Sequence, residues 1–138
     1  MALPAVELPL LNGGNYLFTE KSTPCLINFW ATWCPPCRAE MAALNRLHTD
    51  YTARGLGVIA VSVDEDANLV REFVRKEGLS LPVLLDRGSR LATSAFGVRA
   101  FPTSLLVNGQ ARVSAVWLGE RDWDAADVRA AIAQSLGT

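Results

Sequence analysis

The sequence predicts an α/β domain in which helices flank both faces of a mixed sheet. Apolar segments of strand length alternate with segments of helical periodicity along most of the chain. Near the end, two strand-like segments follow one another across Asn108-Gly109, a pair typical of hairpin turns. Strands that alternate with helices imply parallel pairs joined by right-handed crossovers, and the hairpin adds antiparallel strands at one edge. The 138 residues suit a single domain over residues 1–138.

The first part of the chain is expected to hold the central strand and a long helix. Residues 12–24 contain Gly, Ser, Thr and Pro and predict a loop-rich entry with a short strand over residues 16–18. The mostly apolar residues 25–31 predict a buried central strand. Apolar residues then recur at helical spacing over residues 35–51, before a glycine-containing segment ends the helix.

The middle of the chain predicts two further strand and helix pairs. Residues 58–63 are rich in β-branched side chains and predict another buried strand. Residues 66–77 predict a helix that is closed by Gly78. A short strand over residues 82–85 and a short helix over residues 89–95 follow.

The last part of the chain does not alternate strands with helices, because two consecutive strands precede a single helix. Residues 103–107 and 112–118 are the predicted strands of the hairpin. Asp122 is the expected N-cap of a final helix that ends near Leu136.

Composition and charge exclude several classes of function. The chain has 13 basic and 14 acidic residues, and its basic residues form no block, so a nucleic-acid partner is not expected. No apolar run approaches the ~18 residues of a membrane span. The opening residues 1–11 are apolar but contain Pro4 and Glu7 and lack a positively charged start, unlike an intact signal peptide. We therefore expect either a cytoplasmic protein or a chain whose targeting segment has been removed.

The most informative feature is the cysteine pair in Trp33-Cys34-Pro35-Pro36-Cys37. Cys34 comes just after the predicted central strand and at the start of the predicted helix. The first amide N–H groups of a helix lack partners and carry partial positive charge, which stabilises a thiolate, the nucleophilic form of cysteine. Cys37 lies one turn further on the same helix face and is able to resolve a mixed disulfide at Cys34.

The two prolines between the cysteines suit the first turn of a helix, where N–H groups have no helical acceptor. Neither Pro35 nor Pro36 donates a hydrogen bond to the thiolate, so its stabilisation should be moderate. A moderately stabilised thiolate predicts a reductant's potential.

A Cys-x-x-Cys pair has other uses in proteins. A zinc site needs four ligands, and only Cys25 and His48 remain as candidates. Covalent haem attachment requires a histidine directly after Cys37, where the chain has Arg38. A purely structural disulfide would close a very small loop and stabilise the fold little. No metal or cofactor beyond a redox-active Cys34–Cys37 disulfide is expected.

These residues resemble the TlpA/ResA-like branch of the thioredoxin-fold thiol-disulfide oxidoreductases. The resemblance covers about residues 13–136 and is carried by NFWATWCPPCRAEM at residues 28–41 and VSVDE at residues 61–65. It implies a thioredoxin-like fold in which residues 1–24 are an N-terminal extension and residues 66–86 an extra helix–strand insertion.

The resemblance also implies a function. Such proteins are exported or membrane-tethered disulfide reductases that act in cytochrome c maturation, copper-centre assembly or oxidative-damage repair. It implies a periplasmic or other extracytoplasmic location, a protein substrate with disulfides or thiols, and a membrane or soluble thiol protein as electron donor. We expect a monomer.

Further site residues follow from the same resemblance. Pro102 is implied to form a cis peptide that faces the cysteine pair and turns the backbone of Phe101 towards a substrate peptide. Without the resemblance, a trans proline at the start of an edge strand would be favoured. Together with Trp33, Pro35 and Pro36, these two residues form the expected substrate-binding set.

Glu40 is the candidate for proton transfer. A partly buried carboxylate with a raised pKa could take the proton from Cys37 as that residue attacks. The alternative is an ordinary solvated Glu near a helix N-terminus. Asn28 strengthens the first interpretation, because ordinary thioredoxins carry a proton-accepting Asp at its position and Asn accepts no proton at neutral pH.

The sequence leaves three functions open. The first is a redox enzyme in which Cys34 attacks a substrate disulfide and Cys37 resolves the product. The second is a thiol peroxidase, although the Pro-x-x-x-Thr-x-x-Cys pattern of that class is absent around the two cysteines. The third is a binding module that uses the cysteines for packing or copper delivery. Peroxide consumption favours the second, and copper binding without disulfide reduction favours the third.

Overall fold

The computed structural model describes residues 1–19 and 24–136, so residues 20–23 of the predicted entry loop lie outside the described part. A five-stranded mixed sheet has the order β5-β4-β3-β6-β7. Its strands are β3 (Cys25–Trp30), β4 (Gly57–Ser62), β5 (Val83–Leu85), β6 (Thr103–Val107) and β7 (Val113–Leu118). β3, β4 and β5 are parallel, whereas β6 and β7 run antiparallel to their neighbours.

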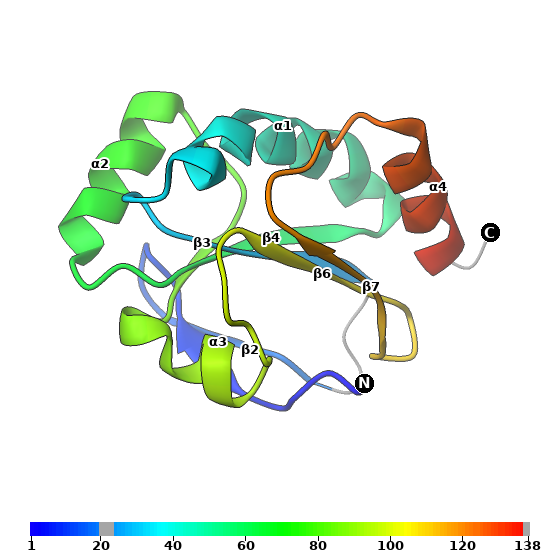
Figure 1. The fold of residues 1–138 in the computed structure, drawn as a ribbon, viewed down its shortest axis with the longest axis horizontal. Coiled ribbons are helices and arrows are strands. Elements are labelled where there is room, and N and C mark those ends of the chain that lie inside the picture. The colour runs from blue at the N-terminus through cyan, green and yellow to red at the C-terminus, as the bar shows by residue number, and fades with distance from the viewer. Residues whose placement is uncertain (20–23, 137–138) are drawn as a thin grey trace.

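Helices cover both faces of this sheet, as the sequence predicts. They are α1 (Pro35–Tyr51), α2 (Ala67–Glu77), α3 (Arg90–Ser94) and α4 (Ala126–Ser135), with short 3₁₀ turns η1 (Thr52–Arg54) and η2 (Arg87–Ser89). Figure 1 shows α1, α2 and α4 on one face and α3 on the other. Within the described residues, no helix has the length and apolar character needed to cross a membrane.

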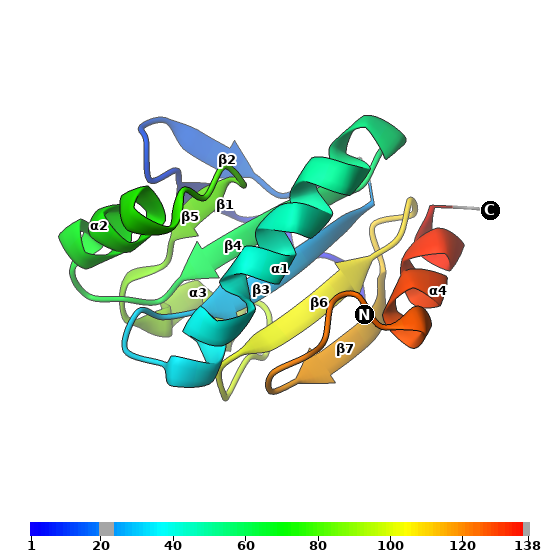
Figure 2. The same cartoon turned by 90° about the horizontal axis from the view of Figure 1, so that it is seen from above.

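The central position of β3 explains its composition. All six of its residues are buried, because β4 and β6 flank it and α1 crosses above it (Figure 2). A strand covered on both faces needs a continuous apolar run and no alternation. The edge strand β7 alternates between half-buried and exposed residues, since only one of its faces is covered.

The N-terminal residues form a hairpin of which the sequence predicted only the second strand, over residues 16–18 where the structure has Asn15–Leu17. β1 (Glu7–Pro9) pairs antiparallel with β2 (Asn15–Leu17) in a separate two-stranded sheet. The Leu11 N–H donates to the Val83 carbonyl at 2.9 Å, which attaches this hairpin to the edge strand β5. β1 is short and contains proline, so its sequence carries no strand pattern.

One local prediction is wrong and another is confirmed. Asp122 does not cap α4, because its carboxylate accepts a hydrogen bond from the Asp124 N–H at 3.0 Å in a turn and the helix begins at Ala126. The predicted hairpin is present, because β6 and β7 pair antiparallel and Asn108-Gly109 lies in the connection between them. Its connection ends where the Asn108 N–H bonds the Arg112 carbonyl at 2.9 Å, and Ala111 supplies the left-handed residue with a φ of 58°.

Candidate active site

The cysteine pair lies where the central strand ends and the long helix starts. Cys34 is the N-cap of α1, with an extended backbone (φ −105°, ψ 103°), which confirms its predicted position at the helix start. Cys34 and Cys37 are joined by a disulfide, with their Cα atoms 5.2 Å apart. Cys34 keeps 5% of its surface exposed, whereas Cys37 has none. Cys34 is therefore the outer residue of the pair.

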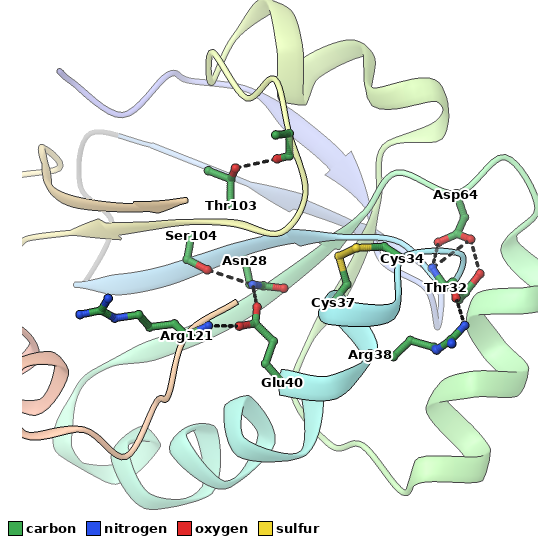
Figure 3. The surroundings of a disulfide bond; sticks show 11 residues. Asn28, Thr32, Cys34, Cys37, Arg38, Glu40, Asp64, Thr103, Ser104 and Arg121 are labelled. Atoms are coloured by element: carbon green, nitrogen blue, oxygen red, sulfur yellow. Dashed lines mark hydrogen bonds between the residues drawn. A yellow bond between two sulfur atoms is a disulfide. The ribbon is translucent and has the colours of Figure 1, made fainter. Parts of the chain in front are cut away.

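The loop that carries Cys34 is fixed to the end of the neighbouring strand. The buried Asp64, just after β4, accepts a hydrogen bond from the Thr32 N–H at 3.0 Å and another from the Thr32 hydroxyl. The Ser62 hydroxyl donates to the same carboxylate at 2.7 Å. On the other side, the Arg38 guanidinium donates to the Thr32 carbonyl at 2.8 Å (Figure 3). These bonds hold the approach to α1 in one conformation.

A proline loop lies next to the cysteine motif. The Phe101–Pro102 peptide is cis, in agreement with what the resemblance implied. The rings of Trp33 and Phe101 meet edge to face with centroids 6.1 Å apart. Because Trp33 directly precedes Cys34, this contact places the loop beside the disulfide. Trp33 is 62% exposed, so the pair forms an open apolar surface at the site.

Glu40 is buried, so the solvated interpretation of this residue is wrong. Its carboxylate accepts hydrogen bonds from the Asn28 side-chain amide at 2.8 Å and from the Arg121 N–H at 3.0 Å. The Trp123 indole N–H donates to the same carboxylate at 3.1 Å. Burial raises the pKa of Glu40, and these three hydrogen bonds oppose that rise in part. The carboxylate thus joins α1, β3 and the segment between β7 and α4.

Asn28 has a structural role that the sequence did not reveal. Its amide nitrogen donates both to Glu40 and to the Ser104 hydroxyl on β6, the latter at 2.9 Å (Figure 3). Ser104, Arg121 and Trp123 were not expected near the site. Glu40 and Trp123 are 83 residues apart in sequence, and no local pattern marks such a contact.

The remaining candidate ligands do not gather at the disulfide. Cys25 is a free, buried cysteine at the start of β3, and burial raises the pKa of its thiol to about 12. It lies at the opposite end of β3 from Cys34, so one metal ion cannot bind both. His48 contacts the Thr52 hydroxyl at 3.1 Å. Among residues 1–19 and 24–136, no group of three or more His, Cys, Asp or Glu side chains could hold a metal ion.

A cysteine pair at the tip of the helix that follows the central strand, beside a cis-proline loop, defines a thioredoxin-fold protein with a redox-type disulfide. The chain belongs to the Redoxin family, whose profile matches residues 1–132.

Individual relatives within this family carry narrower descriptions than the family itself. The chain is 38% identical over 93 residues to the thiol-disulfide oxidoreductase ResA of Halalkalibacterium halodurans, a match that covers 67% of this chain and 52% of that protein. It is 32% identical over 117 residues to ResA of Geobacillus thermodenitrificans, covering 84% and 67% respectively. A secreted thiol-disulfide isomerase from Corynebacterium glutamicum has a similar structure, with a TM-score of 0.87, 27% identity, and coverage of 99% of this chain and 86% of that one.

These matches confirm both the thioredoxin-like fold and the ResA-like resemblance. The aligned part of the chain spans about half the length of the first ResA relative.

Proposed function

We propose that the chain is a protein-disulfide oxidoreductase that acts as a reductase through a dithiol–disulfide cycle of Cys34 and Cys37. The observation that carries the proposal is the disulfide at the N-terminus of α1, with Cys34 outermost. The helix dipole at this end favours a negative charge on the Cys34 sulfur, while Pro35 and Pro36 supply no N–H to it. The ResA relatives, described as thiol-disulfide oxidoreductases, support the same activity.

The proposed reaction has two exchange steps. The Cys34 thiolate attacks one sulfur of a substrate disulfide, which breaks the substrate S–S bond and releases the other sulfur as a thiolate. Cys37 then loses its proton and attacks the Cys34 sulfur, which releases the second substrate sulfur. The substrate gains two electrons, and the protein is left with the Cys34–Cys37 disulfide. A thiol protein that donates electrons returns it to the dithiol.

Glu40 is the proposed proton acceptor for Cys37. The two residues are one turn apart on the same buried face of α1. The raised pKa of the carboxyl brings its proton affinity closer to that of a thiol, which favours transfer in both directions. Its three hydrogen-bond donors fix the position of the carboxylate before the proton is transferred.

The proposed substrate contacts surround Cys34. Trp33, Pro35 and Pro36 are exposed beside it, and they present an apolar surface to a substrate protein. The backbone of Phe101, ahead of the cis Pro102, is the proposed pairing site for an extended substrate segment.

We further propose an extracytoplasmic location and a role in cytochrome c maturation or related thiol maintenance. The similar structure from Corynebacterium glutamicum belongs to a protein described as secreted, which supports the location. The pathway rests on the family resemblance. The proposed partners are a disulfide-containing protein substrate and a membrane or soluble thiol protein as electron donor, with the chain itself as a monomer.

Insulin reduction in the presence of a small dithiol tests the activity. We expect the wild-type chain to accelerate it, Cys34→Ser to abolish the acceleration, and Cys37→Ser to accumulate a mixed disulfide with insulin. Cys25→Ser is the matched control and should retain activity, because Cys25 is buried away from the site. Wild-type activity in Cys34→Ser would contradict the proposal, and a midpoint potential near that of strong oxidants, roughly −120 mV, would contradict the reductase direction.

A further inference from the structure

A buried acceptor beside the disulfide lacks a hydrogen-bond partner. In the described part of the chain, only two buried side-chain nitrogen or oxygen atoms are unpaired, Asn28 Oδ1 and Trp30 Nε1. Asn28 is completely buried, so the Oδ1 atom has lost its hydration. An unpaired buried acceptor costs free energy, which makes this oxygen a place where the molecule gains from a new donor.

The orientation of the Asn28 amide is fixed by its neighbours. Its nitrogen donates to the Glu40 carboxylate at 2.8 Å and to the Ser104 hydroxyl at 2.9 Å. Exchanging the nitrogen and the oxygen would place the amide oxygen against a carboxylate oxygen, where the two acceptors repel. The Oδ1 atom must therefore point away from Glu40.

The Asn28 oxygen, which points away from Glu40, is directed towards the side of Cys37. Cys37 and Glu40 lie one turn apart on the buried face of α1. Figure 2 shows α1 crossing over β3, the strand that contains Asn28, and the Asn28 amide bonds Glu40 from that strand. Figure 3 shows the Asn28 nitrogen bonded on the Glu40 side and the amide oxygen directed to the side of Cys37. In the disulfide form the Cys37 sulfur carries no proton, so it has no hydrogen bond to donate.

We propose that Asn28 is a positioning residue whose Oδ1 atom accepts a hydrogen bond from the Cys37 thiol once the disulfide is reduced. The inference rests on the proposed dithiol–disulfide cycle and deepens it. Reduction satisfies the unpaired oxygen, so Asn28 stabilises the dithiol over the disulfide. The bond also holds the proton on Cys37, which leaves Cys34 as the thiolate of the pair.

A donor dithiol reduces the Cys34–Cys37 disulfide in this step. The donor dithiol transfers two electrons to the Cys34–Cys37 bond and becomes a disulfide itself. Of its two protons, one binds the Cys37 sulfur and is donated to Asn28, and the other is released to solvent when Cys34 remains a thiolate. In the reverse direction, the attack of Cys37 first breaks this hydrogen bond and transfers the proton to Glu40.

Infrared spectroscopy of the S–H stretching band tests the hydrogen bond directly. In a Cys25→Ala/Cys34→Ser background, Cys37 is the only thiol, and we expect its band at a lower frequency than that of a free thiol. Adding Asn28→Leu should return the band to the free position. An unchanged band position after Asn28→Leu would overturn the proposal. If that variant does not fold, Asn28→Ala also removes the oxygen and provides the same readout.

The equilibrium of the wild-type cysteine pair with glutathione tests the energetic consequence. Asn28→Leu should shift this equilibrium about tenfold towards the disulfide, which corresponds to a potential ~30 mV more negative for a two-electron couple. No shift, or a shift towards the dithiol, would overturn the proposal.

Two controls separate Asn28 from its neighbours. Ser104→Ala leaves the Asn28 oxygen and its bond to Glu40 in place, and Trp123→Phe removes a different donor of Glu40, so both should leave the potential near its wild-type value. An equal shift in Trp123→Phe would mean that Asn28 acts only through Glu40 and would also overturn the proposal. Neither measurement uses a substrate, so a failure of insulin reduction contradicts the proposed function without changing either readout.

Discussion

At the scale of single residues, Glu40 and Asn28 differ in one property: the Glu40 carboxyl can exchange a proton, and the Asn28 amide cannot. Glu40 titrates, while Asn28 offers a donor and an acceptor that do not change charge. A carboxyl at both positions would place two like charges within hydrogen-bond distance of each other, and one of them would then remain protonated. An amide at Asn28 avoids that coupling and leaves Glu40 as the titrating member of this pair.

Glu40→Gln should slow the resolution of the mixed disulfide by about 10²-fold, because it removes the proton acceptor. In the wild type, the rate should rise with pH as Glu40 ionises, at a pH above that expected for an ordinary carboxyl, since burial raises its pKa. Stopped-flow measurement of intramolecular resolution across pH checks this. The variant should lose that rise, and an identical pH profile in both proteins would contradict the role of Glu40.

The same residue affects stability with a definite sign. The folded state holds the Glu40 proton to a higher pH than the unfolded chain does, so the free energy of unfolding falls as pH rises between the two pKa values. Urea titrations should show this component in the wild type and its absence in Glu40→Gln.

At the scale of elements, the parallel strands β3, β4 and β5 end at the same edge of the sheet, and the loops that follow β3 and β4 are hydrogen-bonded to each other. Asp64 after β4 bonds Thr32 after β3, which fixes the turn into α1. The helix dipole can stabilise a Cys34 thiolate only if this turn keeps the sulfur at the N-terminal end of α1. The position of Cys34 thus depends on a neighbouring strand.

Asp64→Ala should destabilise the fold by about 1–3 kcal/mol, because it leaves the partly buried Thr32 N–H and the buried Ser62 hydroxyl without their acceptor. Asp64→Asn retains one oxygen and should lose less. Urea denaturation measures both, and alkylation of Cys34 in the reduced protein reports whether the turn has loosened. Equal stability of the alanine variant and the wild type would show that Asp64 does not fix this turn.

At the scale of the whole molecule, apolar residues are buried on the central strand and exposed on the edge strand of the sheet. One leucine on each of these strands allows the two environments to be compared. Leu26 on β3 is completely buried, whereas Leu118 on the edge strand β7 is 78% exposed. Leu26→Ala should cost about 2–5 kcal/mol of unfolding free energy, and Leu118→Ala should change it by less than about 0.5 kcal/mol. Similar losses in both variants would contradict the burial described for the two strands.

The sequence by itself determined the features that depend on neighbouring residues. The apolar run of β3, the helical spacing of α1 and the place of Cys34 between them follow from local periodicity and helix-end chemistry. These interactions span few residues, so a single sequence displays them. The α/β class and the mixed sheet follow from the order of such elements.

Only the tertiary structure decided the environment of Glu40. Its donors come from β3 and from the segment that leads into α4, and sequence spacing does not record which of these backbones meet. The strand β1 and the start of α4 at Ala126 were missed for a related reason, because short segments and turns adapt to the surface on which they pack. Burial, and with it the raised pKa of Glu40, belongs to the packed molecule, because it depends on distant parts of the chain coming together.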